Sequence, residues 1–537
     1  MRRETLFRAA IVALGASVAA SGMAFAKEEP KQGGILKFVV PAEPPSFDGH
    51  KETTFALIHP IAPFYSVLIR VNPDNPASLT DFRCDLCTEM PKPADGGKTY
   101  TFKIRKGVQF HDGTPLTAKD VAATFSRIAF PPQGISSARK GQWAMLDSVA
   151  APDDETVVFK LKFPSAAFIP VLANPYNFVY SKAKLDQDQK WYETHIMGSG
   201  PFVFEKREAG ARITGKANKN YYHKGKPYLD GFEAIFAKKQ SLRVQAVRGD
   251  QAAIEFRGFP PKSRDDLVRA LGKDITVQES DWNCGLVLTP NHSKKPFDDP
   301  RVRRALTLAL DRWGGSKDLS KIAIVKSAGG LVFPGHELGL SKAELEKVAG
   351  YWPDIEKSRA EARRLLKEAG HPNLSFTFLN RATDQPYTIV GTWMIDQWKK
   401  VGITAKMRNE ATAGWFAGLR AGDFEVGVTA NCQSVVNPLL DVAYYLPTGR
   451  SSQQYGKFKD PELEKIYDTM VRATDPAEQK KLMGQYERRV MDEQAHNFQV
   501  FWWYRIIPYR SYLKGWKISP SHYLNQDLSG LWLDRDS

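Results

Sequence analysis

Strand patterns and helix patterns alternate along the whole 537-residue chain, and this mixture constrains the fold more than any other feature. The segment "TYTFKIR" places Tyr100, Phe102 and Ile104 two residues apart between polar neighbours, which is the period of a half-buried strand. "DDETVVFKLKFP" repeats this pattern, and between the two lies "TAKDVAATFSRI", whose apolar residues have helical spacing. A composition of 42% hydrophobic and 25% charged residues is typical of a globular protein. The sequence therefore predicts an α/β protein large enough for more than one lobe.

Two helices have clear sequence signals at their ends. In "FDDPRVRRALTLALDRWGG", Asp299 is placed to cap the helix, Pro300 takes the first helical position, and Gly314–Gly315 is expected to end it. "KSRAEARRLLKEAGHP" predicts a second helix, which Gly370 should end. No long linker separates such segments, so the predicted lobes should pack closely.

The first residues read as an export signal. "MRRETLFR" is basic, "AAIVALGASVAA" is a short apolar run, and Ala24–Phe25–Ala26 is a small-residue cleavage site. The apolar run is too short for a membrane-spanning helix, and no later stretch is long enough. We expect residues 1–26 to be removed and the mature protein to work in the periplasm. Arg2–Arg3 leaves open whether the general or the twin-arginine route exports it.

Four cysteines in an exported chain favour disulfides over metal ligation. Cys84 and Cys87 form a C-x-x-C in a loop, and a zinc site would need two further ligands that no second C-x-x-C supplies. We therefore predict a local Cys84–Cys87 disulfide, which leaves Cys284 and Cys432 to pair with each other. No metal site and no cofactor are predicted.

The formal net charge of +15 does not indicate nucleic-acid binding, because the basic residues are scattered and the protein is expected outside the cytoplasm. The chain contains no G-x-S-x-G, no H-E-x-x-H and no P-loop. His111 and Asp112 stand in "FHDGTPLTAKDV" without a nucleophile, so this segment is interpreted as a structural turn. The sequence predicts that the protein is not an enzyme. An exported hydrolase is the alternative from another functional class.

Six ordered segments resemble the family 5 extracellular solute-binding proteins of ABC importers, whose members bind oligopeptides, dipeptides or nickel complexes. They are "GGILKFVVPAEPPSFD", "DGGKTYTFKIRKGVQFHDGTPLTAKDV", "GSGPFVFEK", "NKNYYHKGKPYLDGF", "KKPFDDPRVRRALTLALDR" and "EARRLLKEAG". The resemblance implies a monomer that captures a small molecule and delivers it to a membrane permease driven by cytoplasmic ATPase subunits.

The same resemblance implies the class II periplasmic-binding-protein fold, with two mixed-sheet α/β lobes that close around a cleft by a hinge. An extra subdomain is inserted in the first lobe. The implied boundaries are residues 27–70, 190–283 and 505–537 for the first lobe, 71–189 for the insert, and 284–504 for the second lobe.

The cleft residues are also implied by this resemblance. In the oligopeptide-binding relatives a disulfide matching Cys284–Cys432 holds the strand that lines the cleft, here "TANCQSVVNP". An Asp two residues after the cysteine binds the ligand ammonium in peptide-binding relatives, but Ser434 takes that place here, and no acid lies between Val426 and Leu440. A buried ammonium without a carboxylate is costly, so the strand argues against a ligand anchored by a free amine. Glu43 is the alternative acid.

Other matching positions favour an anion. Arg381 in "LNRATDQPY" matches an arginine that holds a ligand carboxylate, and guanidinium groups bind carboxylate or phosphate through two hydrogen bonds. Trp415 matches a tryptophan beside the ligand, and either Trp502 or Trp503 should face the cleft, with Trp502 the chosen site residue. The neutral strand is expected to contribute hydrogen bonds from Asn431, Cys432, Gln433 and Ser434.

These residues predict a small polar or anionic ligand, such as an opine-like conjugate, a sugar phosphodiester or a modified peptide. A conventional dipeptide or oligopeptide receptor is the first alternative. A receptor for a nickel chelate or haem is the second.

Overall fold

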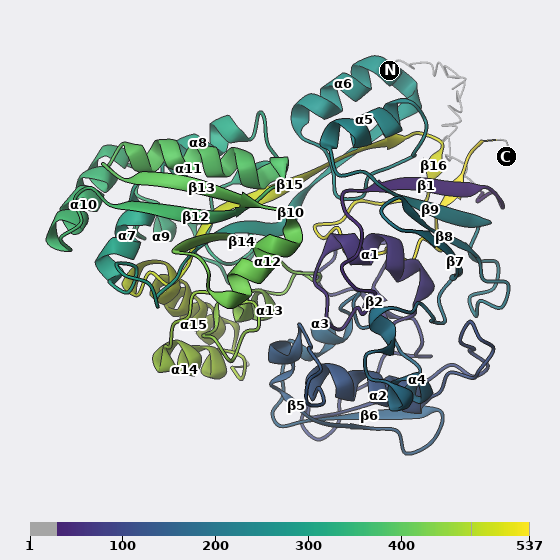
Figure 1. Ribbon diagram of the computed structural model, residues 1–537. Coiled ribbons are helices and arrows are strands. Elements are labelled where there is room, and N and C mark those ends of the chain that lie inside the picture. The colour runs from purple at the N-terminus through teal and green to yellow at the C-terminus, as the bar shows by residue number, and fades with distance from the viewer. Residues whose placement is uncertain (1–28, 474, 536–537) are drawn as a thin grey trace, which may run out of the picture.

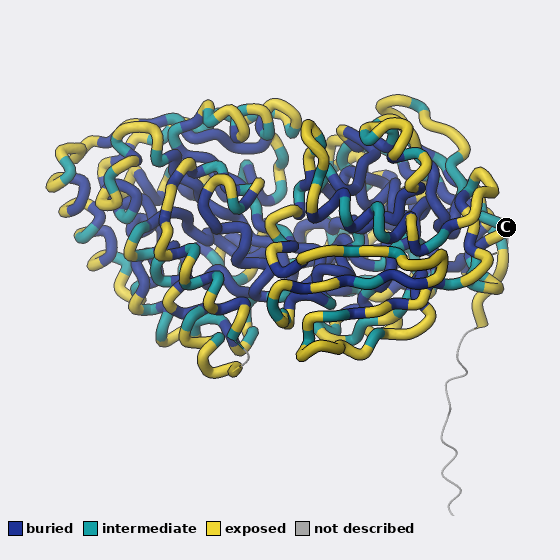
Figure 2. The backbone as a smooth tube through the Cα atoms, turned by 90° about the horizontal axis from the view of Figure 1, so that it is seen from below, coloured by how far each residue is buried: buried dark blue, intermediate teal, exposed yellow. Residues whose placement is uncertain are grey.

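The computed structural model describes residues 29–473 and 475–535, so the expected signal peptide lies outside the described residues (Figure 1). Within these ranges no helix is both long and apolar enough to cross a membrane. Two α/β halves lie side by side, each with its own sheet and buried interior. Figure 2 shows the buried backbone inside each half and the exposed loops around it.

A four-stranded mixed sheet forms the centre of the first half. Its strands, in spatial order, are β1 (Ile35–Val40), β9 (Gly231–Phe236), β8 (Arg212–Ala217) and β7 (Phe202–Glu208). β1 runs parallel to β9; at its start Leu36 is buried between the exposed Ile35 and Lys37, and from Phe38 to Val40 the strand is buried on both faces. Helices α5 (Gln240–Arg248) and α6 (Pro261–Leu271) lie above this sheet in Figure 1.

A separate three-stranded antiparallel sheet stands below it. The strands are β4 (Thr99–Lys103), β6 (Thr156–Leu161) and β5 (Leu146–Ala150), and helix α2 (Ala118–Ala129) packs on them. Phe125 of α2 meets Phe159 of β6 with ring centroids 5.2 Å apart. The predicted alternation in β4 is confirmed, because Tyr100 and Phe102 are buried while their neighbours are not. The predicted helix is also confirmed, and Thr117 caps its first turn.

The second half is built on a six-stranded mixed sheet. The order is β11 (Val325–Ser327), β15 (Phe498–Arg510), β10 (Ile275–Pro290), β14 (Val426–Cys432), β12 (Ser375–Arg381) and β13 (Thr404–Glu410). Fold-class expectations are thereby met: this is a mixed α/β protein with two lobes, the architecture of bilobal periplasmic binding proteins. The residue boundaries given above for the lobes and the insert stay predictions.

Helix α7 (Pro300–Leu308) begins as predicted, with the Asp299 side chain accepting from the N–H of Arg301. Its predicted end at Gly314–Gly315 is wrong, because a new helix, α8 (Arg312–Leu319), runs through both glycines. The Asp311 carboxylate caps α8 at Gly314 and leaves no room there for a Cβ atom. A glycine pair therefore marks a crowded cap here and not a helix end.

The long strands β10 and β15 join the two halves as one antiparallel ribbon. Phe498 and Phe501 of β15 belong to the core of the second half, whereas Ile507 and Tyr509 of the same strand belong to the core of the first. A pair of strands shared by two cores is suited to act as a hinge, since bending it moves the lobes without opening either core.

The C-terminal segment returns to this ribbon, where the carbonyl of Pro520 accepts from the N–H of Asn283 at 2.6 Å. The other elements include α1 (Phe55–Ile61), α3 (Phe168–Leu172), α4 (Lys182–Gln187), α9 (Lys342–Leu345), α10 (Ile355–Glu368), α11 (Ile389–Lys399), α12 (Thr412–Ala421), α13 (Pro438–Val442), α14 (Pro461–Met470), α15 (Pro476–Arg488), β2 (Ile69–Val71), β3 (Phe82–Cys84), β16 (Leu513–Lys514) and β17 (Trp532–Leu533). α10 ends just before Gly370, which takes φ +80°, as the sequence predicts.

Candidate ligand-binding site

A pocket lies between the two halves, beside the ribbon that joins them. The space free of protein atoms amounts to about 640 Å³, part of which is open solvent. The first half contributes residues 53–55 and two residues of the C-terminal segment, His522 and Tyr523. The remaining lining residues are Arg381, Tyr387, Trp415, Phe416, Thr429, Ala430, Cys432, Tyr444, Gln453, Tyr455 and Trp503. The lining is aromatic and hydroxyl-rich, and it contains no Asp or Glu.

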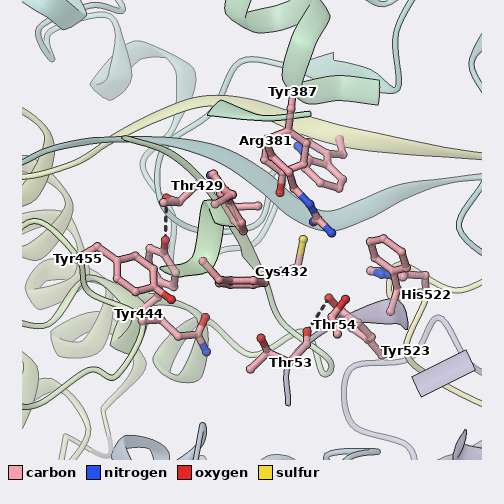
Figure 3. Close-up of a pocket in the computed structure, with 16 residues that line it drawn as sticks. Thr53, Thr54, Arg381, Tyr387, Thr429, Cys432, Tyr444, Tyr455, His522 and Tyr523 are labelled. Carbon is pink, nitrogen blue, oxygen red and sulfur yellow. Dashed lines mark hydrogen bonds between the residues drawn. The ribbon is translucent and has the colours of Figure 1, made fainter. Parts of the chain in front are cut away.

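Arg381, at the end of β12, is the one charged side chain among these lining residues. Its Nε donates to the Thr412 hydroxyl at 3.0 Å, and no ion pair involving Arg381 occurs in the described ranges. The guanidinium carbon lies 5.5 Å from the ring centroid of Phe55, 5.6 Å from that of Tyr387 and 5.4 Å from that of Trp415. Figure 3 shows the guanidinium reaching into the pocket toward Cys432. Aromatic faces therefore surround the charge, and neither Nη group has an acceptor within residues 29–473 and 475–535.

A second arginine, Arg257, lies behind the pocket-lining rings of Phe55 and Trp503. Arg257 is buried, donates across the cleft to the Gln385 carbonyl at 2.9 Å, and lies over the rings of Phe55 and Trp503 at 5.1 and 5.4 Å. Burial, aided by the positive charge of Arg381 and opposed by Glu255, lowers the pKa of Arg257 to about 10. Arg257 is still protonated at neutral pH, so it adds positive potential at this end of the pocket.

Both predicted disulfides, Cys84–Cys87 and Cys284–Cys432, are present. The second joins β10 to β14 with Cα atoms 4.1 Å apart, and Cys432 itself forms part of the pocket wall. The disulfide thus fixes the strand that borders the pocket.

The neighbours of Cys432 are arranged differently from the sequence expectation. Asn431 points behind the strand, where its Nδ2 donates to the Asp441 carbonyl at 3.0 Å and its Oδ1 accepts from Gln433. Gln433 in turn accepts from Gln142 of the lower subdomain at 3.2 Å. Asn431, Gln433 and Ser434 are buried but are not among the lining residues. The strand presents Thr429, Ala430 and Cys432 to the pocket instead.

Of the three tryptophans considered in the sequence analysis, Trp415 and Trp503 line the pocket and Trp502 does not. Trp415 lines the pocket, with its indole held by a 3.1 Å hydrogen bond to the Val428 carbonyl. Trp502, the residue chosen from the sequence, faces away: it donates to the Gly330 carbonyl at 3.0 Å and packs edge-on against Phe333. Trp503 lines the pocket in its place, because successive residues of a strand point to opposite faces.

Glu43 lies outside the pocket lining. Its carboxylate pairs with Arg207 at 2.7 Å and accepts from the N–H of Gly210. Two acids that the sequence analysis did not single out lie next to pocket elements. Glu52 directly precedes Thr53, and burial raises its pKa. Asp441 lies behind the strand beside Asn283, with its pKa raised well above the usual range by burial. Neither carboxyl is a lining group.

An aromatic pocket between two α/β lobes joined by a hinge defines a bilobal binding protein of the periplasmic type. Over residues 81–453 the sequence matches the model of the bacterial extracellular solute-binding proteins, family 5 Middle. Because this match spans more than half of the chain, the protein belongs to the family 5 solute-binding proteins of ABC importers, as the sequence resemblance implied. It is a binding component and not an enzyme.

Named relatives and solved structures agree with this assignment. The glutathione-binding protein GsiB of Escherichia coli (strain K12) is 28% identical over 412 residues, which cover 72% of this chain and 75% of GsiB. The binding protein AgaA of A. tumefaciens R10, solved with agropinic acid, superposes with a TM-score of 0.82 at 22% identity, covering 94% of this chain and 99% of AgaA. DppA of Helicobacter pylori, solved with the peptide STSA, gives 0.80 at 22% identity with the same coverage. At this identity the two structures support the fold alone.

Proposed function

We propose that this protein is the periplasmic receptor of an ABC importer for a small polar or anionic ligand with a carboxylate or phosphate group. The ligand classes are an opine-like conjugate, a sugar phosphodiester or a modified peptide. One observation carries the proposal: the Arg381 guanidinium faces a pocket whose lining contains no acid, and its Nη groups have no acceptor among the described residues.

The physical argument concerns the cost of this arrangement. Arg381 is only 6% exposed, and a buried charge is unfavourable unless an opposite charge and hydrogen bonds compensate for its lost hydration. An anionic ligand would supply both through a two-bond contact with the guanidinium. Arg257 strengthens the preference for an anion, since it adds a second positive charge behind the same wall. The relative GsiB binds glutathione, a small acid, which supports the same class.

The proposal includes delivery. A signal peptide in residues 1–26 would bring the protein to the periplasm, and the closed protein with its ligand would dock on a membrane permease with its ATPase subunits. Contacts across the cleft support a closed form, among them Arg257 to the Gln385 carbonyl and the Ser452 hydroxyl to the Ala138 carbonyl at 3.0 Å. Closure of this kind is the signal that a hinged receptor can offer to a partner.

A conventional peptide receptor is the second candidate, and Glu52 favours it. The Glu52 side chain makes no hydrogen bond or ion pair in the described structure, and it adjoins the lining residues Thr53 and Thr54. A ligand ammonium could therefore pair with Glu52 while a ligand carboxylate meets Arg381. The neutral strand from Thr429 to Cys432 gives no further support to an ammonium.

Native mass spectrometry of protein isolated without denaturation from the exported fraction separates the candidates. Release of a small acid, or of a peptide with a blocked amine, would support the proposal. Release of plain peptides with free amino termini would replace it by the second candidate. Thermal unfolding with glutathione, agropinic acid and the dipeptide Met-Leu gives an independent ranking, because a ligand at 100 times its Kd adds about 2.7 kcal/mol of stability.

A further inference from the structure

His522 stands on the pocket wall beside Thr54 and Tyr523 (Figure 3). Its Nδ1 lies 2.8 Å from the indole Nε1 of Trp282. An indole nitrogen can only donate a hydrogen bond, so Nδ1 of His522 is the acceptor and carries no proton. The identity of the neighbouring residue therefore fixes which ring nitrogen is the acceptor.

The ring is also uncharged. It is 1% exposed, and its surroundings contain the cations Arg257 and Arg505 and a second buried histidine, His59. Burial and these neighbours hold the pKa of His522 well below its usual range, while the nearby Glu255 carboxyl pairs with Arg243. A neutral imidazole without a proton on Nδ1 carries it on Nε2. His522 is therefore an N–H donor at Nε2.

This donor has no acceptor in the described structure, since Nε2 of His522 is buried and makes no hydrogen bond. The ring cannot turn easily to find one, because its centroid is 4.8 Å from that of Trp282 and 3.9 Å from that of Tyr523. The backbone is held as well, through the hydrogen bond from Nε2 of His59 to the His522 carbonyl at 3.0 Å. Trp503, on the same wall, has an indole N–H that is likewise buried without a partner.

We propose that His522 donates a hydrogen bond from Nε2 to an oxygen atom of the bound ligand and so helps to determine specificity. This inference rests on the proposed function only in taking the pocket as the ligand site. The acceptor is a carboxylate, carbonyl or hydroxyl oxygen, and a ligand that presents an N–H or an ammonium at this point is disfavoured because two donors then face each other. Arg381 selects for charge, whereas His522 selects for an acceptor at a fixed position.

The tautomer is tested without any ligand. Nitrogen-15 NMR of protein labelled at histidine, with His522→Gln to assign the signal, should give an Nε2–H, Nδ1-acceptor ring whose shifts do not change between pH 6 and 8. A proton on Nδ1, or a titration inside this range, overturns the proposal.

Binding is tested with a matched pair of variants. His522→Gln places an amide N–H near the position of Nε2, whereas His522→Asn keeps an acceptor near Nδ1 for Trp282 but lacks the donor toward the pocket. The probe is the tightest binder among the compound released in mass spectrometry, glutathione, agropinic acid and Met-Leu, measured by calorimetry. We expect His522→Asn to weaken binding roughly tenfold or more and His522→Gln to stay within about threefold.

The matched pair separates binding from structure, because a purely structural role follows the Trp282 hydrogen bond and would spare His522→Asn. Equal losses in both variants, or none in either, overturn the proposal. If Met-Leu proves the tightest probe, the anionic class fails while the His522 test still stands, since the dipeptide also offers carbonyl and carboxylate oxygens.

Discussion

Two buried arginines in this molecule have opposite surroundings. Arg127 on α2 lies among acceptors: its Nη groups reach the Asp48 carboxylate at 2.6 Å, Nδ1 of His50 at 2.8 Å and the Gln189 carbonyl at 2.7 Å. Arg381 is almost as deeply buried but has aromatic rings around it and a single hydrogen bond to a hydroxyl. The Nη groups of the first arginine have acceptors within the protein, whereas those of the second have none among the described residues. A structural charge and a binding charge are thus distinguished by acceptor count and not by depth.

The largest expected effect concerns Arg127. Arg127→Met leaves the Asp48 carboxylate buried without its cation, so we expect the free energy of unfolding to fall by about 3–5 kcal/mol. Denaturant unfolding measures the loss. The double variant Arg127→Met/Asp48→Asn serves as the control and should recover part of it, because no uncompensated charge is left. A loss below about 1 kcal/mol in the single variant would mean that Arg127 is not structural.

Arg381→Gln should affect ligand binding and not stability, the reverse of what we expect for Arg127→Met. We expect ligand affinity to fall by about 2–4 kcal/mol, while the free energy of unfolding without ligand changes little or rises, because an unpaired buried charge is removed. Calorimetry and unfolding of the same preparation measure the two quantities. The matched control is Arg363→Gln, an exposed arginine of the second lobe whose Nη1 donates only to the Lys400 carbonyl. Unchanged affinity in Arg381→Gln would remove the main support for an anionic ligand.

Trp502 and Trp503 of β15 also differ in whether the protein supplies an acceptor for their polar group. Trp502 is satisfied by the Gly330 carbonyl, so Trp502→Phe should lower the free energy of unfolding by roughly 1 kcal/mol and leave affinity unchanged. Trp503 has an unpaired indole N–H on the pocket wall, so Trp503→Phe should weaken binding by roughly 1 kcal/mol with little effect on stability without ligand. Reversed results would assign the pocket face to Trp502.

The sequence could not choose between these two tryptophans, and the reason is physical. Period-2 alternation reveals a face only when the other face is exposed, but every residue from Phe498 to Trp503 is buried. The pairing of β15 with β10 also shifts register between Trp282 and Gly285, which breaks any count along the strand. In β4, where one face is exposed, the same alternation gave a correct prediction.

The sequence could likewise predict only some of the residues that line the pocket. Arg381, Trp415 and Cys432 could be placed at the pocket through the family resemblance, which supplies positions along the chain. His522 could not, because it reaches the wall from the C-terminal segment and its tautomer depends on Trp282, a residue 240 positions away in sequence. No local pattern carries such a contact. Asn431 lies away from the pocket lining for a related reason, since its partners behind the strand are the Asp441 carbonyl of α13 and the Gln433 side chain.

The smallest expected effect is a pH dependence that sharpens the comparison of the arginines. Burial by itself would raise the pKa of Asp48, but His50 and Arg127, through charge and hydrogen bonds, lower it below its usual value. A lowered pKa in the folded state stabilises the protein above the unfolded pKa, and this contribution is lost as the pH falls through the folded pKa. Burial and the charge of Arg127 lower the pKa of His50 to about 3.

Arg127→Met removes two of the effects that lower the pKa of Asp48, so we expect that pKa to rise and the loss of stability at low pH to become smaller. The difference in unfolding free energy between wild type and Arg127→Met should therefore shrink steadily as the pH is lowered from 6 to about 3.5, as measured by urea unfolding at each pH. Arg381→Gln, which leaves no carboxylate unpaired, should run parallel to wild type over the same range. If the difference in unfolding free energy between wild type and Arg127→Met stays constant with pH, Asp48 keeps its charge without the arginine. The number of acceptors would then not separate the structural arginine, Arg127, from the binding arginine, Arg381.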